Sequence, residues 1–339
     1  MRAATTRAFA ALLLVGTAAG CSDPEPEATE QGAAGKGELT AELLTQVTSV
    51  HEETGMTLLE GPVFAPDGGL LVVDVPTPAG EPKVLRVDTD TEEVSTVFTD
   101  DTGAYTSAQF GPLDDRLYLT DFAGGGIVSM TAEGKDPEVF FSGDVDGEPM
   151  NPDDLTFDEA GNMYVSDSAG FDAPAWEARG RVVRIDGETA EATVPAEDLP
   201  APNGIAFTPD HSGLWVGLYG ANRVDHYELN EDGTEVLTSH AAIHFDGGTS
   251  RIDSIAVDAE GNLYQAVHGQ PRIFVYSSTG EHLTTVSVPE GAASGLDTAT
   301  NVAIAPGTTD AYMTVSGADG GFVYTFDALG EGIRQSNGG

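Results

Sequence analysis

Six oxygen-bearing side chains recur in one phase of a repeat that runs along most of the chain. The repeat is marked by a large residue that returns every 46 to 51 residues: Leu71, Tyr118, Tyr164, Trp215, Tyr264 and Tyr312. A polar residue stands 11 positions before each marker, or 12 before Trp215: Glu60, Ser107, Asp153, Asn203, Asp253 and Asn301. If the repeats are arranged radially, all six side chains point at one axis. The spacing therefore predicts a site at that axis.

The types of side chain at this axis indicate the chemistry. Four of them offer carboxylate or amide oxygens, with no sulfur or imidazole: Glu60, Asp153, Asn203 and Asp253. Such a set favours a hard cation, with Ca²⁺ as the first choice and Mg²⁺ as the runner-up. A ring of polar side chains around ordered water is the other interpretation. A cation with open positions polarises a carbonyl or phosphoryl oxygen, and a neighbouring carboxylate serves as general base or acid. Hydrolysis of an ester-like bond is the expected reaction.

Three further residues are candidates for substrate contact. Ser107 and Asn301 should line the same channel, and His268 should lie near its rim, as should Asp74, Asp121 and Asp167. The sequence has no G-x-S-x-G nucleophile motif and no glycine-rich phosphate loop.

The formal net charge is −42, with 14 Lys and Arg against 56 Asp and Glu. Nucleic acid is therefore excluded as a partner, because its phosphates would be repelled.

The elements that must position these residues are short strands. Apolar runs are separated by Gly- and Asp-rich turns, and about four such runs fill each repeat, which is typical of propeller blades. We predict an all-β fold, a six-bladed β-propeller of four-stranded antiparallel blades over residues 39–339. The last repeat is short, and residues 44–50 are predicted to supply its missing outer strand. We expect a monomer.

The N-terminus has the pattern of a processing signal. Basic residues precede an apolar run at 9–15, and small residues lead to Cys21, the only cysteine in the chain. We predict a lipoprotein signal peptide over 1–21 with lipidation at Cys21, then a disordered acidic linker over 22–38. The protein would be extracytoplasmic and held at the bacterial cell membrane only through this lipid anchor. A plain secretory peptide with a free cysteine is the alternative.

Four segments of the sequence resemble the signatures of the gluconolactonase, senescence-marker-protein and luciferin-regenerating-enzyme-like family. They are Leu-Glu-Gly-Pro-Val-Phe at 59–64, Asp-Asp-Leu-Thr-Phe-Asp at 153–158, Pro-Asn-Gly-Ile-Ala-Phe at 202–207 and Asp-Ser-Ile-Ala-Val-Asp at 253–258. The resemblance implies a six-bladed propeller with Ca²⁺ in its central channel, held by Glu60, Asn203 and Asp253. Asp-Asp and Asp-Ser are most similar to the drug-responsive lactonase subgroup, whereas the sugar-acid lactonases have Arg-x-Asn and Asp-Gly.

The resemblance also implies roles. Asp253 would be the proton donor or base, Asp153 a metal ligand and catalytic partner, and Ser254 a further ligand. A second, structural Ca²⁺ could be supplied by Asp144 and Asp146. The expected function is a Ca²⁺-dependent lactonase acting on a small-molecule lactone or ester. The alternatives are an organophosphate (phosphotriester) hydrolase on the same metal site and a non-catalytic, Ca²⁺-stabilised surface binding propeller.

Overall fold

Apolar runs joined by tight Gly and Asp turns form antiparallel hairpins throughout the chain. The computed structural model describes residues 37–171 and 174–337, all of which belong to one unit, Lys36–Gly339. Within this part the structure is all-β, apart from three short 3₁₀ turns: η1 (Ala175–Glu177), η2 (Tyr219–Ala221) and η3 (Ala293–Gly295). No helix among the described residues is long and apolar enough to cross a membrane.

Four of the sheets have four antiparallel strands each, in chain order. The first is β3 (Leu59–Phe64), β4 (Leu70–Asp74), β5 (Pro82–Val87) and β6 (Val94–Thr99). The second is β7 (Tyr105–Phe110), β8 (Leu117–Asp121), β9 (Gly126–Met130) and β10 (Glu138–Ser142). The third is β11 (Pro152–Phe157), β12 (Met163–Asp167), β13 (Gly180–Ile185) and β14 (Ala192–Leu199). The fourth is β15 (Pro202–Phe207), β16 (Gly213–Leu218), β17 (Arg223–Leu229) and β18 (Val236–His244).

The rest of the chain forms a ten-stranded sheet that contains two further runs of strands. One run is β19 (Arg251–Asp258), β20 (Leu263–His268), β21 (Arg272–Tyr276) and β22 (His282–Ser287). The other is β23 (Thr298–Ile304), β24 (Asp310–Gly317) and β25 (Gly320–Asp327), with β2 (Glu42–Thr48) on its outer edge. A single pair, Val267 with Ala299, joins the two runs.

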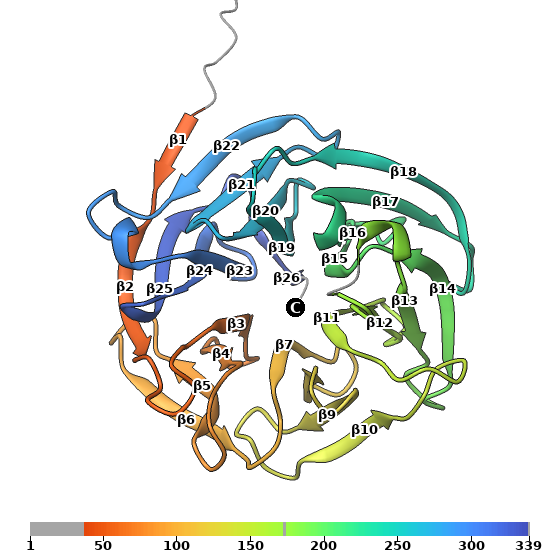
Figure 1. Ribbon diagram of the computed structural model, residues 1–339, viewed down its shortest axis with the longest axis horizontal. Helices are drawn as coiled ribbons and strands as arrows, with labels where there is room; N and C mark the ends of the chain where they lie inside the picture. Colours follow the sequence, from red (N-terminus) through yellow and green to blue (C-terminus); the bar gives the residue numbers. More distant parts are fainter. Residues whose placement is uncertain (1–36, 172–173, 338–339) are drawn as a thin grey trace, which may run out of the picture. The chain divides into compact units, whose positions relative to one another are not determined.

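The sheets are arranged around a common axis, with the first strand of each innermost (Figure 1). These inner strands are β3, β7, β11, β15, β19 and β23. The core lies between neighbouring sheets: for example, Leu71 and Val73 pack in one cluster with Leu117 and Met130. Five of the six marker residues are buried, and Tyr312 is partly buried. The repeat therefore marks the layers of the core.

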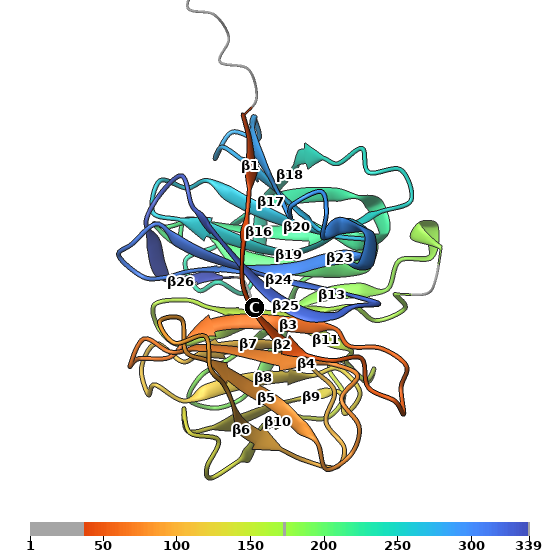
Figure 2. The same cartoon turned by 90° about the vertical axis from the view of Figure 1, so that its left-hand side faces the viewer.

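The N-terminal strands close the ring of sheets, as the short last repeat predicted. β2 pairs antiparallel with β25, with Glu42 opposite Thr325. β1 (Gly37–Thr40) was not predicted: it pairs parallel with β22, so Gly37 and Glu38 are strand residues although they fall inside the predicted linker. The edge-on view shows β1 and β2 following one another along the outer rim (Figure 2).

The C-terminal strand crosses the opposite end of the axis from the loops that follow β4, β8 and β12. β26 (Gly332–Asn337) pairs with the end of β19, contacts β3, β11, β15 and β23, and ends at the centre of the ring (Figure 1). Gln335 Nε2 donates to the carbonyl oxygen of Phe110 at 2.9 Å. One short strand therefore contacts the inner strand of every repeat at this end, where the inner strands enter their hairpin turns.

Candidate functional site

The inner strands carry an interruption of their pairing at the phase that the sequence singled out. In four of them, three residues advance against two on the neighbouring strand: between 60 and 63, 152 and 155, 202 and 205, and 252 and 255. In β7 and β23 the interruption is shorter, with two residues advancing against one, at 106 and 300. Such bulges turn side chains out of the normal alternation. The four longer interruptions begin at, or directly before, Glu60, Asp153, Asn203 and Asp253, which are four of the five predicted metal ligands.

Glycine follows two of these residues because the inner strands approach closely there. Gly61 has φ +49°, and a Cβ atom on it would lie 2.6 Å from the backbone nitrogen of Ala108. A Cβ atom on Gly204 would lie 2.6 Å from Ile255 Cγ1 and 2.8 Å from the Asp253 carbonyl oxygen. The Glu-Gly and Asn-Gly pairs are therefore required by packing as well as by the site.

Hydrogen bonds connect the axial side chains and leave particular oxygens free. Asn203 Nδ2 donates to Asp153 Oδ2 at 3.1 Å, and the Ser168 hydroxyl lies 3.1 Å from the same oxygen and also near the Pro202 carbonyl. Asn203 Oδ1 and Glu60 Oε2 are buried and have no hydrogen-bond partner. Buried polar atoms are rarely left unpaired, so both oxygens mark places where a ligand or water belongs.

The carboxyl groups at the axis share a shift of pKa in one direction. Burial, then the charges of Asp253, Asp154 and Asp153, raises the pKa of Glu60 well above its usual range. Burial and the charge of Asp153 do the same to the pKa of Asp253. Burial raises the pKa of Asp153 to about 6, against the lowering effect of its bonds from Ser168 and Asn203. A cation at the axis would remove the cause of this mutual repulsion.

His268 lies at the edge of the site. Its Nδ1 is 3.7 Å from Asp253 Oδ2, and its side chain is 47% exposed, so it can meet a ligand from solvent. Partial burial lowers its pKa, which favours the neutral imidazole at neutral pH. The ring of Tyr219 lies 6.1 Å away. A cavity of about 440 Å³ opens beside His268, walled by Met56, Leu58 and Ala318 among others.

The other predicted site residues are placed as follows. Ser107 and Asn301 are fully buried; the Ser107 hydroxyl has no partner, and Asn301 Oδ1 accepts from the backbone nitrogen of Val302 at 2.7 Å. Neither reaches the surface, so contact with a substrate would require it to enter the axis. Ser254 is 1% exposed and lies near the carboxyl group of Asp154. Ser107 and Asn301 lie on the inner strands β7 and β23, and their roles in lining the channel and contacting a substrate stay predictions.

The rim aspartates have structural partners instead. Asp74 Oδ2 accepts from His51 at 2.8 Å and from Thr57 at 2.9 Å, while Oδ1 accepts from the Leu58 backbone. Asp167 is held by Arg181 through both Nε and Nη2. These carboxylates fasten the loops around the site and do not face the axis as free groups.

Two residues were missed. Ser168, directly after β12, bonds to Asp153, and Asp154 is 1% exposed with both carboxylate oxygens unpartnered. The Asp-Asp pair in the sequence was the available signal for Asp154, but regular strand alternation would have turned one of the two away.

The axial side chains offer a cation only oxygen atoms as ligands. Among the described residues, no group of three His, Cys, Asp or Glu side chains could hold a metal ion. Amide and hydroxyl oxygens would have to complete the coordination, and the free oxygens of Asn203 and Glu60 are buried beside the carboxylates. Oxygen-only sets of this type suit Ca²⁺.

Two further predicted features concern other parts of the chain. Cys21 and the segment 1–21 fall outside the described residues. Asp144 and Asp146 are exposed residues on either side of Val145, whose backbone pairs with Glu148. Their role in a second Ca²⁺ site stays a prediction.

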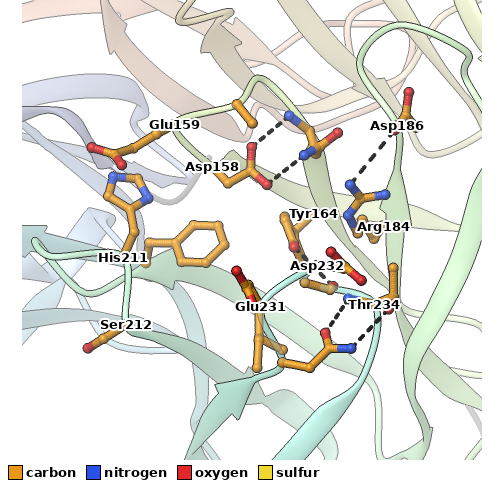
Figure 3. A pocket seen from close by; sticks show the side chains of 16 residues that line it. Asp158, Glu159, Tyr164, Arg184, Asp186, His211, Ser212, Glu231, Asp232 and Thr234 are labelled. Carbon is orange, nitrogen blue, oxygen red and sulfur yellow. Dashed lines mark hydrogen bonds and ion pairs between the residues drawn. The ribbon is translucent and has the colours of Figure 1, made fainter.

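A cavity of about 700 Å³ lies at the hairpin turns of the third and fourth sheets, away from the axial site (Figure 3). It is acidic, but its polar groups mostly serve their own turns. Asp158 accepts from the backbone and side chain of Asn162, both at 2.8 Å, and Arg184 lies 3.8 Å from Asp186. Among its described lining residues, this cavity therefore has no buried acid without a hydrogen-bond partner.

The fold and site together define a class: propeller-like proteins whose inner strands present acidic and amide side chains at one end of the axis. Residues 58–317 match the model of the SMP-30/gluconolactonase/LRE-like region, and the chain belongs to that family.

Several relatives within and around this family are similar to the chain. Lactonase drp35 of Staphylococcus haemolyticus is 28% identical over 288 residues, which cover 81% of this chain and 84% of the relative. A gluconolactonase of Xanthomonas campestris has the same fold, with a TM-score of 0.66, 19% identity, and coverage of 86% and 98%. Regucalcin of Agrobacterium tumefaciens, a calcium-binding protein, superposes with a TM-score of 0.64 at 16% identity, covering 87% and 99%.

Proposed function

We propose that the protein is a Ca²⁺-dependent lactonase that opens a lactone ring at the axial site. The observation that carries this proposal is the free, buried oxygens of Glu60 and Asn203 beside carboxyl groups of raised pKa. The names of the relatives, lactonase and gluconolactonase, and the calcium-binding regucalcin support the same reading.

Glu60, Asn203 and Asp253 would hold the cation, with Asp153 and Ser254 next to them. When bound, Ca²⁺ supplies a Lewis acid for the lactone carbonyl oxygen. Asn203 is already oriented for this role, because its amide nitrogen is bonded to Asp153 and its oxygen is left free.

Asp253 would accept the proton of the attacking water and later return it. As a general base it takes a proton from the attacking water while the water oxygen bonds to the carbonyl carbon. When the ring C–O bond breaks, the same carboxyl group returns the proton to the departing oxygen, which becomes the product hydroxyl. His268, 3.7 Å from Asp253 and half exposed, would contact the substrate at the rim. Asp153, bonded by Ser168 and Asn203, would orient these groups.

A substrate panel tests the proposal. Purified full-length protein is assayed on aliphatic, aromatic and sugar lactones and on phosphotriesters, with Ca²⁺, with Mg²⁺ and with a chelator. We expect lactone hydrolysis that chelation abolishes and Ca²⁺ restores. Cleavage of phosphotriesters alone would reassign the site to organophosphate hydrolysis, and no hydrolysis of any panel member would favour a binding propeller.

We also propose that the ring has six blades and acts as a monomer. Four sheets stand alone, and the ten-stranded sheet would count as two blades because only Val267 and Ala299 pair between its halves.

We further propose lipid anchoring at Cys21 from the sequence pattern. When the protein is expressed in a bacterium, Cys21→Ser should move it from the membrane fraction to the soluble extracytoplasmic fraction. Unchanged membrane association would contradict the proposed lipid anchor.

A further inference from the structure

Arg251, the first residue of β19, is a cation without a carboxylate partner. It is partly buried, and among the described residues its side chain forms no ion pair and no hydrogen bond. The other described arginines that are not fully exposed, and one that is, have a carboxylate oxygen within 4 Å: Arg86, Arg116, Arg181, Arg184, Arg223 and Arg334. Arg179 and Arg272 have none, but both are exposed to water. Charged groups that are removed from water are normally paired, so Arg251 marks a place for an anionic ligand.

The pairing of β19 with β20 places Arg251 at the rim of the axial site. Arg251 lies directly opposite His268, and opposite residues of an antiparallel pair project from the same face of the sheet. His268 Nδ1 is 3.7 Å from Asp253 Oδ2, and the ring of His268 is 6.1 Å from the ring of Tyr219. Arg251 and Tyr219 are therefore neighbours of the proposed general base.

The hydroxyl group of Tyr219 is a second donor at this place. Burial, then the charge of Asp253, raises the pKa of Tyr219, and the charge of Arg251 acts in the opposite direction. The phenol is therefore protonated at neutral pH. Its hydroxyl has no hydrogen-bond partner in the described part of the chain, so it can donate to a ligand beside the guanidinium group.

Both donors are held in fixed positions by one side chain. Asn222 directly follows η2, the turn that begins at Tyr219. Asn222 Nδ2 donates to the Ser250 carbonyl oxygen at 2.8 Å, and Asn222 Oδ1 accepts from the Ile252 backbone nitrogen at 3.0 Å. These are the two residues that flank Arg251. Donors that are positioned before binding lose little freedom when a ligand arrives.

The cavity of about 440 Å³ beside His268 does not offer such donors. His268 and Asp297 are its only titratable lining residues, and no Lys or Arg lines it. Its walls at Met56, Leu58 and Ala318 suit the carbon atoms of a lactone ring. A carboxylate placed there would face Asp297, so an anionic substituent is directed towards Arg251.

We propose that Arg251 and Tyr219 form an anion subsite that selects lactones carrying a carboxylate substituent. The inference rests on the proposed function in taking the reacting lactone carbonyl at the axis from it. A guanidinium group binds a carboxylate through two parallel N–H bonds, and the phenol hydroxyl supplies a third. A phosphate dianion fits less well, because its second charge would have no cation to pair with and would lie near Asp253.

A matched pair of substrates tests the subsite. The kcat/KM of purified, Ca²⁺-loaded full-length protein is measured on the γ-carboxylate of γ-butyrolactone and on the neutral γ-carboxamide. We expect the wild type to prefer the carboxylate by about tenfold or more. The ratio should fall to about one in Arg251→Gln and by a smaller factor in Tyr219→Phe, which removes only a hydroxyl group.

Arg272→Gln is the matched control, because it removes the same charge from an exposed residue at the start of the neighbouring strand, β21. It should keep the wild-type ratio. An equal fall in Arg272→Gln would show that the charge acts from a distance and would overturn the subsite. An unchanged ratio in Arg251→Gln, or a wild type that prefers the carboxamide, would overturn it as well.

A binding measurement separates this inference from the proposed function. Cyclopentanecarboxylate and cyclopentanecarboxamide, which have no lactone bond, are titrated calorimetrically into protein with and without Ca²⁺. Carboxylate binding that weakens about tenfold in Arg251→Gln but not in Arg272→Gln, in a protein that hydrolyses no lactone, supports the subsite and overturns the lactonase. Lactone hydrolysis with carboxylate binding that needs Ca²⁺ and not Arg251 keeps the lactonase and overturns the subsite.

Discussion

Carboxylates lie at both ends of the inner strands, but the hydrogen-bond donors around them differ between the two ends. At the turn end, Asp258 accepts from the backbone nitrogens of Glu260 and Asn262 and from the Tyr264 hydroxyl. At the site end, Asp154 has no hydrogen-bond partner at either oxygen. Aspartate is therefore structural where the chain supplies hydrogen-bond donors, and it is available to bind a ligand where the chain supplies none.

The pKa values of the aspartates also differ between the turn end and the site end. Hydrogen bonds from Ser212 and Thr208 lower the pKa of Asp210, at a turn, to about 2. Burial raises the pKa of Asp153, at the site end, to about 6 although Ser168 and Asn203 donate to it. The axis is also closed at the turn end, where Gln335 of β26 bonds to Phe110. We therefore expect chemistry at one end and stability at the other.

The largest effect should follow removal of a charge at the site end. Asp253→Asn keeps the shape of the side chain but removes the proposed base, so kcat on the best lactone should fall by about 10²–10⁴-fold. Asp210→Asn, at the turn end, is the control and should leave kcat unchanged. Steady-state kinetics on both variants measures this; wild-type kcat in Asp253→Asn would show that another group moves the proton.

A methyl group between the inner strands should damage both stability and activity. Gly204→Ala places a Cβ atom 2.6 Å from Ile255 and 2.8 Å from the Asp253 carbonyl, and such overpacking costs about 1–3 kcal/mol. Gly291→Ala, where no atom lies within 4 Å, is the matched control and should be neutral. Denaturant unfolding compares the two. Equal stability would mean that the inner strands are not tightly seated around Asn203.

At the closed end, stability should change without a change in chemistry. Gln335→Ala removes the donor to the buried Phe110 carbonyl, which should cost about 1–3 kcal/mol of unfolding free energy. Arg334→Ala breaks only an exposed ion pair with Asp115 and a bond to the Gly111 carbonyl, so about 1 kcal/mol or less is expected. Both variants should keep the wild-type kcat well below their melting temperatures. A fall in kcat for Gln335→Ala in folded protein would break the division between the two ends.

The smallest effect concerns the pH dependence of the metal-free protein. The raised folded-state pKa of Asp153 means that the folded state binds this proton more tightly than the unfolded state, whose pKa is near 3.8. This stabilisation is complete below about 3.8 and is lost as the pH rises through about 6. In chelator, the wild type should therefore lose a few degrees of Tm relative to Asp153→Asn between pH 4 and pH 7. Saturating Ca²⁺ should remove the difference, and parallel Tm curves in chelator would contradict the shift.

Much of this division could be predicted from the sequence because the repeat is regular. The large residues that mark the repeat lie in the core layers. The repeat positions of Glu60, Asp153, Asn203 and Asp253 correspond to the four inner strands whose pairing has the longer interruption. The pairing of β2 with β25 followed from the short last repeat.

What was missed depends on contacts that no local pattern encodes. Asp154 is buried beside the axial residue because a bulge breaks the alternation, and the donors His51 and Arg181 lie 23 and 14 residues from Asp74 and Asp167. β26 is a mostly polar segment without strand periodicity, and it becomes a strand because β19 offers a free edge. Likewise, the parallel pairing of β1 with β22 joins residues more than two hundred positions apart.

The closure of the ring by the first strands has a consequence for the order of folding. β1 and β2 are synthesised before the other strands of the ring, yet their partners, β22 and β25, follow more than 200 residues later. Until then, the early sheets can assemble by local hairpins, while the two first strands remain unpaired edges that are open to association with other chains. Closure is therefore expected to be the late, slow step of folding, and the step most dependent on protection by chaperones.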